Sequence, residues 1–323
     1  MTADGRPAPV RWGILGTGAI ARSFTQDLML DGHEVVAVGA RRQESADDFG
    51  GRFGIPRRHA SYDSLLADED VDVVYVATLN PLHEEHAVRA LSAGKHVLLE
   101  KPFAMNALSA EAIFRCADEH GVIVMEAMWS RYLPHLQKLH MLLADGAIGE
   151  VRAVSIDISQ SLSTDPTNRL NDPTAGGGAL YDLGPYALSL MTDIVGEPKE
   201  ITVAARPAAS GVDAQFSLLA CSNAGAQGLI SVAIDLPGRL DCSVVGTRGR
   251  IDIAPAWHRP SELILTTDDR THRYSPPVVG RGMQYEARAL ERLLATDDGP
   301  AADARALTLS VMRTLDAVRT QLP

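Results

Sequence analysis

The sequence has little of what marks disulfide-linked, metal-binding or nucleic-acid-binding proteins. Its three cysteines, Cys116, Cys221 and Cys242, are scattered, odd in number and without the spacing of metal ligands. We therefore interpret them as small core residues. The net charge of −11 provides no basic patch for a phosphate backbone, so no nucleic-acid partner is expected.

Long apolar runs are also absent. No stretch approaches the roughly 20 residues needed to cross a bilayer, so we expect no membrane insertion. Residues 1–9 lack the apolar core of a secretory signal, which makes the cytoplasm the expected compartment. Aromatic residues make up only 5% of the chain, which does not favour a large stacking pocket.

The chain does have the composition of an ordinary globular protein, with 46% hydrophobic and 22% charged residues. Its 323 residues are too many for one core, so two domains are expected. The regular alternation of short apolar runs and amphipathic stretches ends near Trp129. We therefore place one domain at 1–128 and a second at 129–323.

In the first part, short apolar runs alternate with longer amphipathic stretches, which is typical of strands and crossover helices in a parallel sheet. Ile20, Phe24 and Leu28 recur every four residues and predict one such helix. The predicted strands are rich in Val and Ile, as strands covered on both faces should be. They are Val10–Leu15, Val35–Ala40, Val71–Ala77, His96–Leu99 and Val122–Glu126.

The second part predicts helices at Leu133–Ala144 and Ala302–Thr320, with a large and mostly antiparallel open sheet between them. Turns at Pro237-Gly238 and Arg248-Gly249 join several of its strands. The strands begin near Val151 and include Leu229–Leu236, Cys242–Val245, Arg250–Ile253 and Leu263–Thr266. The fold class is therefore α/β.

The segment Gly16-Thr17-Gly18-Ala19-Ile20-Ala21 follows the first predicted strand and opens a helix. This is the context of a dinucleotide fingerprint, in which the glycines permit a tight turn and the approach of a pyrophosphate. The free amides of the helix N-terminus then bind the anion. The alternative is a turn that merely joins strand to helix.

Arg41 and Arg42 follow the second predicted strand, where an NAD-dependent enzyme usually has an acidic residue for the ribose hydroxyls. A guanidinium instead suits a 2′-phosphate and can stack on adenine. The position therefore favours NADP, with NAD as the alternative coenzyme. The two arginines could instead be solvated surface charges.

Glu100-Lys101-Pro102 leaves a predicted strand at its carboxyl end, where open α/β sheets bind ligands. Together with Gly16–Ala21, with 77–83 and with 176–186, this segment resembles the glucose-fructose oxidoreductase and inositol dehydrogenase (Gfo/Idh/MocA) family. The resemblance spans the whole chain. It implies a dinucleotide-binding Rossmann domain at 1–128, followed by an open-sheet α/β domain for substrate binding and oligomerisation at 129–323.

The resemblance also implies roles for single residues. Lys101 would lie near the nicotinamide, followed by a cis bond to Pro102, and Tyr186 would be the acid/base. A tyrosine rather than a histidine at that position, and the segment 126–134, are similar to the dihydrodiol and xylose dehydrogenase branch. Thr78, Asn80, His83 and Glu100 would belong to the coenzyme site, and Trp129 and Arg131 to the substrate site. Leu79 replaces the proline that is frequent in the turn at 77–83.

Asp182 and Tyr186 are four residues apart, which predicts one helix face and one site. Tyrosine is a poor base near pH 7, because its pKa is about 10, and a lysine charge nearby would favour its ionised form. Asp182 would orient the pair or bind a substrate hydroxyl. Alternatively, Tyr186 is an aromatic residue with its hydroxyl bonded elsewhere, and Asp182 is a favourable helix carboxylate.

His83 and His86 are three residues apart but have no companion carboxylate or cysteine set, so no metal is expected. The resemblance places Ile158 and Met283 near the substrate pocket, and because both are aliphatic rather than aromatic, they favour a sugar substrate. The expected reaction is therefore NADP-dependent oxidation of an aldose to a lactone, or the reduction of a related carbonyl. Alternatives are a trans-dihydrodiol dehydrogenase and a non-catalytic NAD(P)-binding regulator. A sheet with one open apolar face predicts a homodimer or homotetramer.

Overall fold

The computed structural model describes residues 9–163, 165–296 and 302–323, which divide into two compact units. Within these residues, every helix is too short or too polar to cross a bilayer. The first unit contains Met1–Ala104, Leu108–Trp129 and Val279–Arg305. The second contains Met105–Ala107, Ser130–Val278 and Ala306–Pro323. A single boundary after residue 128 therefore leaves out the segment 279–305, which returns to the first unit.

Buried polar contacts explain this return. The carboxylate of Asp27, in helix α1 (Ala19–Leu30), accepts hydrogen bonds from the backbone N–H groups of Arg281 and Met283 at 3.0 Å. From helix α9 (Gln284–Ala295), Glu291 accepts a 2.9 Å bond from the indole N–H of Trp12. Such pairings over more than 250 residues leave no local trace in the sequence.

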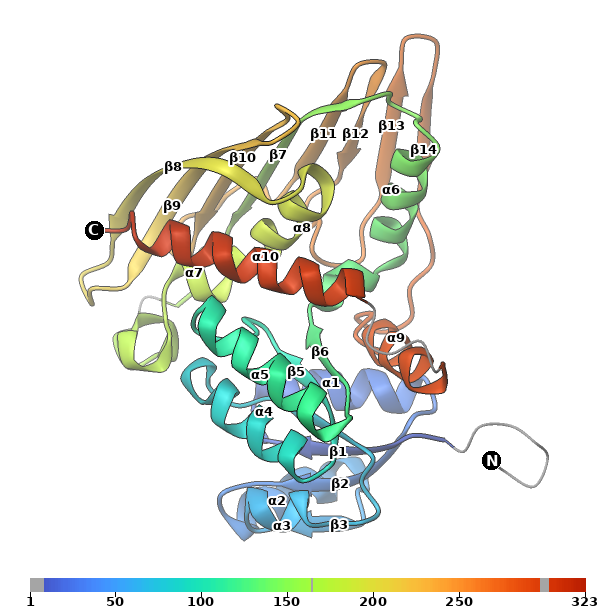
Figure 1. Cartoon of the computed structure of the whole chain (residues 1–323), viewed down its shortest axis with the longest axis vertical. Coiled ribbons are helices and arrows are strands. Elements are labelled where there is room, and N and C mark those ends of the chain that lie inside the picture. Colours follow the sequence, from blue (N-terminus) through green and yellow to red (C-terminus); the bar gives the residue numbers. More distant parts are fainter. Residues whose placement is uncertain (1–8, 164, 297–301) are drawn as a thin grey trace, which may run out of the picture. The chain divides into compact units, whose positions relative to one another are not determined.

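A parallel six-stranded sheet in the order β3-β2-β1-β4-β5-β6 forms the first unit, with α4 and α5 on one face and α1 on the other (Figure 1). The strand β4, with all four residues buried, lies near the middle of the sheet. The strands are β1 (Arg11–Leu15), β2 (Glu34–Gly39), β3 (Arg57–His59), β4 (Val73–Val76), β5 (His96–Glu100) and β6 (Val124–Ala127). The helices between them are α2 (Gln43–Phe53), α3 (Tyr62–Leu66), α4 (His83–Ser92) and α5 (Ala107–His120), with 3₁₀ turns η1 (Asn80–Leu82) and η2 (Trp129–Tyr132).

An eight-stranded sheet in the order β14-β13-β12-β11-β7-β10-β9-β8 forms the second unit, and all its pairs are antiparallel except β7 with β10. Its strands are β7 (Val151–Ser159), β8 (Pro198–Pro207), β9 (Asp213–Ser222), β10 (Gln227–Ala233), β11 (Cys242–Gly246), β12 (Gly249–Ile253), β13 (Leu263–Thr267) and β14 (Thr271–Tyr274). Its helical elements are α6 (Pro134–Ala144), η3 (Arg169–Asn171), η4 (Pro173–Ala175), α7 (Ala179–Asp182) and α8 (Gly184–Val195). The last helix, α10, spans Ala302–Arg319.

One face of this second sheet is covered by its helices, since α8 packs on β7 and β10 and α7 packs on β9. Along β9, buried and more exposed residues alternate, which is the period of a strand covered on one side. The expected fold class is thus confirmed. The strand β3 escaped prediction because Arg57-Arg58-His59, at the edge of its sheet, has no apolar residue.

Candidate functional site

The glycine turn after β1 leaves space for a phosphate group. Gly16 has φ +105°, and a Cβ atom there would lie 2.7 Å from the carbonyl oxygen of Ala77, so the fold itself requires glycine. Gly18 precedes α1 without a side-chain cap, and a Cβ atom there would meet nothing within 4 Å. The first-turn amides of α1 are therefore open to a ligand, beside exposed residues from Gly18 to Ile20. These groups fit the diphosphate of a dinucleotide.

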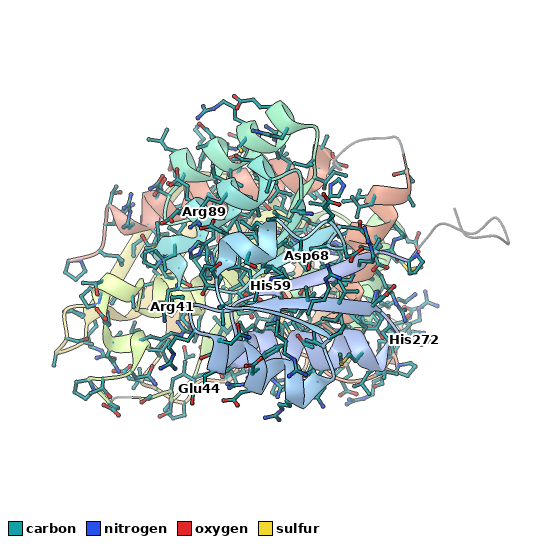
Figure 2. The ribbon with its side chains drawn as sticks, turned by 90° about the horizontal axis from the view of Figure 1, so that it is seen from below. Arg41, Glu44, His59, Asp68, Arg89 and His272 are labelled. Atoms are coloured by element: carbon teal, nitrogen blue, oxygen red, sulfur yellow. The ribbon has the colours of Figure 1, made fainter. Side chains whose placement is uncertain are left out.

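Arg41 and Arg42 are exposed just beyond the end of β2, and Figure 2 shows Arg41 on the same side of the view as Arg89. Arg42 donates a 3.4 Å hydrogen bond to Ser45. Burial raises the pKa of Tyr62, and the Arg41 guanidinium opposes that rise. The rings of Tyr62 and His86 meet edge to face at 4.9 Å. A cation beside an aromatic pair suits the phosphorylated adenosine end of a dinucleotide.

The turn after β4 is held from inside by His83. This histidine is fully buried, and its Nδ1 lies 2.8 Å from the Pro102 carbonyl oxygen, with Nε2 3.3 Å from that of Thr78. Burial lowers its pKa to about 4, so the ring is neutral near pH 7 and donates only one of these bonds. His83 thus fixes the turn, while Thr78 Oγ1 lies 3.0 Å from His86 Nδ1.

Two neighbours of His83 define the outer part of this turn. Leu79, which replaces the family's frequent proline, has φ −71° and ψ 144°, a conformation that proline would also adopt. The substitution therefore leaves the backbone path intact. Asn80 begins the 3₁₀ turn η1 and is buried.

Lys101 follows β5 and is half-buried, and its bond to Pro102 is cis as expected. The carboxyl group of Glu100 accepts one hydrogen bond from the Lys101 N–H at 3.1 Å and another from the Tyr75 hydroxyl. Lys101, the glycine turn, Arg41 and Thr78 follow β5, β1, β2 and β4. Because these strands are parallel, all four lie at the carboxyl edge of one sheet.

In the second unit, Asp182 accepts a 2.9 Å bond from Arg169, a residue that the sequence analysis missed. Tyr186 is buried, and its ring lies 5.4 Å from that of His258, also missed. Neither residue belongs to a motif, and only tertiary contacts connect them with Asp182 and Tyr186. The prediction that Asp182 and Tyr186 share one helix is wrong. The helix α7 ends at Asp182 and α8 begins at Gly184, because Pro185 lacks the N–H that would continue the first helix.

The run Gly176-Gly177-Gly178 brings Arg169 within reach of Asp182. A Cβ atom at Gly177 would lie 2.5 Å from the Leu170 oxygen and 2.6 Å from the Arg169 oxygen. Asp213 of β9 accepts a 2.6 Å bond from Leu180 N–H and so anchors α7. Burial raises the pKa of Asp213 to about 6. The small residue at 177 therefore allows η3 to pack against the start of α7.

Four predicted residues remain, Trp129, Arg131, Ile158 and Met283. Trp129 is buried at the end of the first unit, and Arg131 in the second donates a 2.9 Å bond to Ser189 of α8. Ile158 and Met283 are both almost fully buried, so neither exposes a surface from which substrate preference can be inferred. Among the described residues, no group of three or more His, Cys, Asp or Glu side chains is arranged to hold a metal ion.

A dinucleotide turn at the edge of a parallel sheet and polar residues in an open-sheet unit define an NAD(P)-dependent oxidoreductase. The model described as "Oxidoreductase family, NAD-binding Rossmann fold" matches residues 10–128. The GFO/IDH/MocA C-terminal domain matches residues 136–252. The chain belongs to the Gfo/Idh/MocA oxidoreductase family, which confirms the resemblance drawn from the motifs.

Among curated relatives, trans-1,2-dihydrobenzene-1,2-diol dehydrogenase from Mus musculus is 35% identical, covering 85% of this chain and 83% of its own. The Homo sapiens enzyme of the same name is 33% identical, covering 86% of each. Among solved structures, a 3-ketoreductase from Actinomadura kijaniata in complex with NADP and TDP-benzene has a TM-score of 0.87 at 26% identity, with 98% of each chain covered. An aldose-aldose oxidoreductase from Caulobacter crescentus complexed with glycerol has a TM-score of 0.89 at 27% identity, with 97% of each covered. These relatives are enzymes, which supports a dehydrogenase over a non-catalytic regulator.

We expect Gly177→Ala to lower stability by roughly 1–3 kcal/mol, because the new methyl group overlaps three carbonyl oxygens, of Arg169, Leu170 and Asp172, and displaces η3. Thermal unfolding should show a lower Tm. Gly51→Ala in α2 is the matched control, since a Cβ atom there meets nothing within 4 Å and alanine favours a helix. Equal Tm values for the two variants would contradict this account of Gly177.

Proposed function

We propose that this protein is an NADP-dependent oxidoreductase that oxidises a sugar hydroxyl, such as the anomeric hydroxyl of an aldose, or reduces the related carbonyl. When bound, the coenzyme supplies the hydride acceptor or donor. Tyr186 takes the hydroxyl proton, and the charge of Lys101 favours the ionised tyrosine. Asp182, oriented by Arg169, accepts a hydrogen bond from a substrate hydroxyl. The observation that carries the proposal is the Arg169–Asp182 pair, a polar contact suited to a polyhydroxyl compound.

The preference for NADP depends on Arg41 and Arg42. Arg41 is exposed, and no described residue forms an ion pair or hydrogen bond with it. Its guanidinium is thus available for a 2′-phosphate, and the nearby Tyr62–His86 pair provides an aromatic surface. Thr17, Ala19, Ile20, Thr78 and Asn80 complete the proposed coenzyme site. The 3-ketoreductase neighbour was solved with NADP, which agrees with this preference.

Arg41→Ala should weaken NADP⁺ binding about 10- to 100-fold, the loss expected for a charge-assisted bond worth roughly 1.5–3 kcal/mol. Binding of NAD⁺, which lacks the 2′-phosphate, should change little. Titration calorimetry with both coenzymes measures the difference, and Arg52→Ala, on the exposed surface of α2, is the control. Equal losses for both coenzymes would remove Arg41 from 2′-phosphate recognition.

A trans-dihydrodiol is the second candidate substrate, because the curated relatives are named for one. A cyclic diol and a sugar both present neighbouring hydroxyl groups, which Asp182 could bind alike. The aldose-aldose oxidoreductase neighbour instead favours the sugar. Trp129 and Arg131 are further proposed substrate-site residues.

The decisive measurement is a screen of aldoses, polyols and arene dihydrodiols with NADP⁺ and, separately, with NAD⁺, followed by reduced-nicotinamide absorbance. Turnover of aldoses with NADP⁺ is expected. Turnover of dihydrodiols alone would select the second candidate, and the absence of turnover in either direction would overturn the proposal.

With the substrate so identified, Lys101→Met should lower kcat by orders of magnitude and leave NADP⁺ binding measurable, because the proposed proton transfer loses the positive charge that favours the ionised tyrosine. Lys199→Met, on the exposed edge strand β8, controls for the loss of a lysine. Unchanged kcat in Lys101→Met would remove Lys101 from the mechanism.

We also propose that the open face of the second sheet binds a second copy of this chain. Exposed Leu219 and Leu229 lie directly opposite one another there. The face is hollowed, with a volume of about 1110 Å³, and carries both acidic and basic side chains, so two copies can present opposite charges to each other. One continuous row across it comprises Thr202, Leu219, Leu229, Ser155, Ser243, Asp252, Ile264 and Arg273.

Sedimentation should therefore give a multiple of the 34.6 kDa chain mass for the wild type. Leu219→Lys with Leu229→Lys should yield the monomer, because like charges would face each other across the interface. Leu108→Lys, at a leucine exposed in α5, should leave the assembly unchanged. A monomeric wild type would refute this interface.

A further inference from the structure

Glu100 directs its carboxyl group into the protein. Only 5% of the residue is exposed. One carboxyl oxygen accepts from the hydroxyl of Tyr75, and the other accepts from the backbone N–H of Lys101 at 3.1 Å. Both carboxyl oxygens of Glu100 thus accept hydrogen bonds from residues of the first unit. This arrangement suits a group that acts on Lys101 better than one that binds the coenzyme with its side chain.

Tyr75 holds this carboxyl group from the neighbouring strand. It is fully buried in β4, and its ring stacks on Phe24 with centroids 3.8 Å apart. Tyr75 pairs in register with Leu98, two residues before Glu100, so Tyr75 and Glu100 lie on the same face of the sheet. The hydroxyl is therefore positioned by core packing.

A second buried acid, Glu126, lies on β6 next to β5. It pairs with Leu99, so its side chain starts from the face opposite to that of Glu100. The negative charge of Glu126 raises the pKa of Glu100, because it disfavours a second carboxylate nearby. Two charges therefore act on Glu100, the carboxylate of Glu126 on β6 and the ammonium of Lys101 in its own segment, and the neutral hydroxyl of Tyr75 on β4 donates a hydrogen bond to it.

Glu100 is also the group of this cluster that changes charge near neutral pH. Burial raises the pKa of Glu100 to about 7, against the lowering influence of the Lys101 ammonium and the Tyr75 hydroxyl. His83, next to Lys101, has its pKa lowered to about 4 by burial and remains neutral. A carboxyl group that ionises at neutral pH beside a functional lysine is typical of an active site.

We propose that Glu100, held in place by Tyr75, is the buried counter-charge of Lys101 and keeps its ammonium form in place for proton transfer. Glu100 is thus a positioning residue, and its role rests on the function proposed above for Lys101. When Glu100 is protonated, the ammonium loses this negative charge, which weakens its placement. Activity is then expected to fall on the acid side of about pH 7.

The coenzyme-free protein provides the first test. With glutamate labelled by ¹³C at the carboxyl carbon, the Glu100 resonance is assigned by its loss in Glu100→Gln. We expect its pKa near 7 in the wild type. Tyr75→Phe should raise that pKa, because a donor to the ionised form is lost, and Lys101→Met should raise it because a nearby positive charge is lost.

Glu126→Gln is the matched control, because it changes a buried acid on the adjacent strand in the same way. Removing its negative charge should lower the pKa of Glu100, a shift of opposite sign to that in Tyr75→Phe. A purely structural effect would not produce opposite shifts. An unshifted Glu100 resonance in both Lys101→Met and Tyr75→Phe would overturn the proposal.

Kinetics provide the second test. Glu100→Gln should lower kcat roughly tenfold or more and leave the Kd of NADP⁺ within about twofold, and the acid limb of its kcat/KM profile should disappear. Tyr75→Phe should move that limb to higher pH. A weakened Kd with unchanged kcat would instead make Glu100 a coenzyme contact. Should the wild type fail to bind NADP⁺ or turn over, the proposed function fails, while the resonance shifts still decide the Glu100–Lys101 interaction.

Discussion

The close approach of the Gly16 turn to the backbone of β4 is the constraint on which the coenzyme site depends. Gly16 donates from its N–H to the Gly39 oxygen of β2 at 3.0 Å, and its missing side chain leaves room for the Ala77 oxygen. One residue thus connects the ends of three parallel strands. With a larger side chain, the turn would have to move away from the Ala77 oxygen, and the first turn of α1 would move with it.

Behind that edge, the structure buries polar groups that a core would ordinarily exclude. Unpaired, such groups cost several kcal/mol, so their presence needs partners. His83 contacts two backbone oxygens, and Glu100 accepts from Tyr75 and from the Lys101 N–H. These contacts fix the turns at 78–83 and 100–102 from inside, which leaves Thr78 and Lys101 only partly buried. Rigid support of this kind gives a site its geometry without using the residues that meet the ligand.

In the second unit, polar side chains are positioned mainly by close backbone packing at a glycine. Gly177 allows η3 to lie against the start of α7, which brings Arg169 to Asp182, and Asp213 anchors the same helix through Leu180. The interruption at Pro185 then separates Asp182 from Tyr186. The relation of the two residues is therefore set by a helix break, not by the regular spacing of one helix.

The sequence by itself determined the class of fold, the dinucleotide turn and the family, because strand periodicity and the glycine and lysine motifs depend on residues close along the chain. It also located Arg41 and Lys101, since each lies within two residues of the end of an apolar run, and both runs end at the same sheet edge. Only the tertiary structure decided the contacts of Arg169 with Asp182, of Tyr75 with Glu100, and of Arg281 and Met283 with Asp27 of α1. These contacts join residues up to about 250 positions apart, and no local pattern encodes a pairing that arises only when distant strands and helices pack.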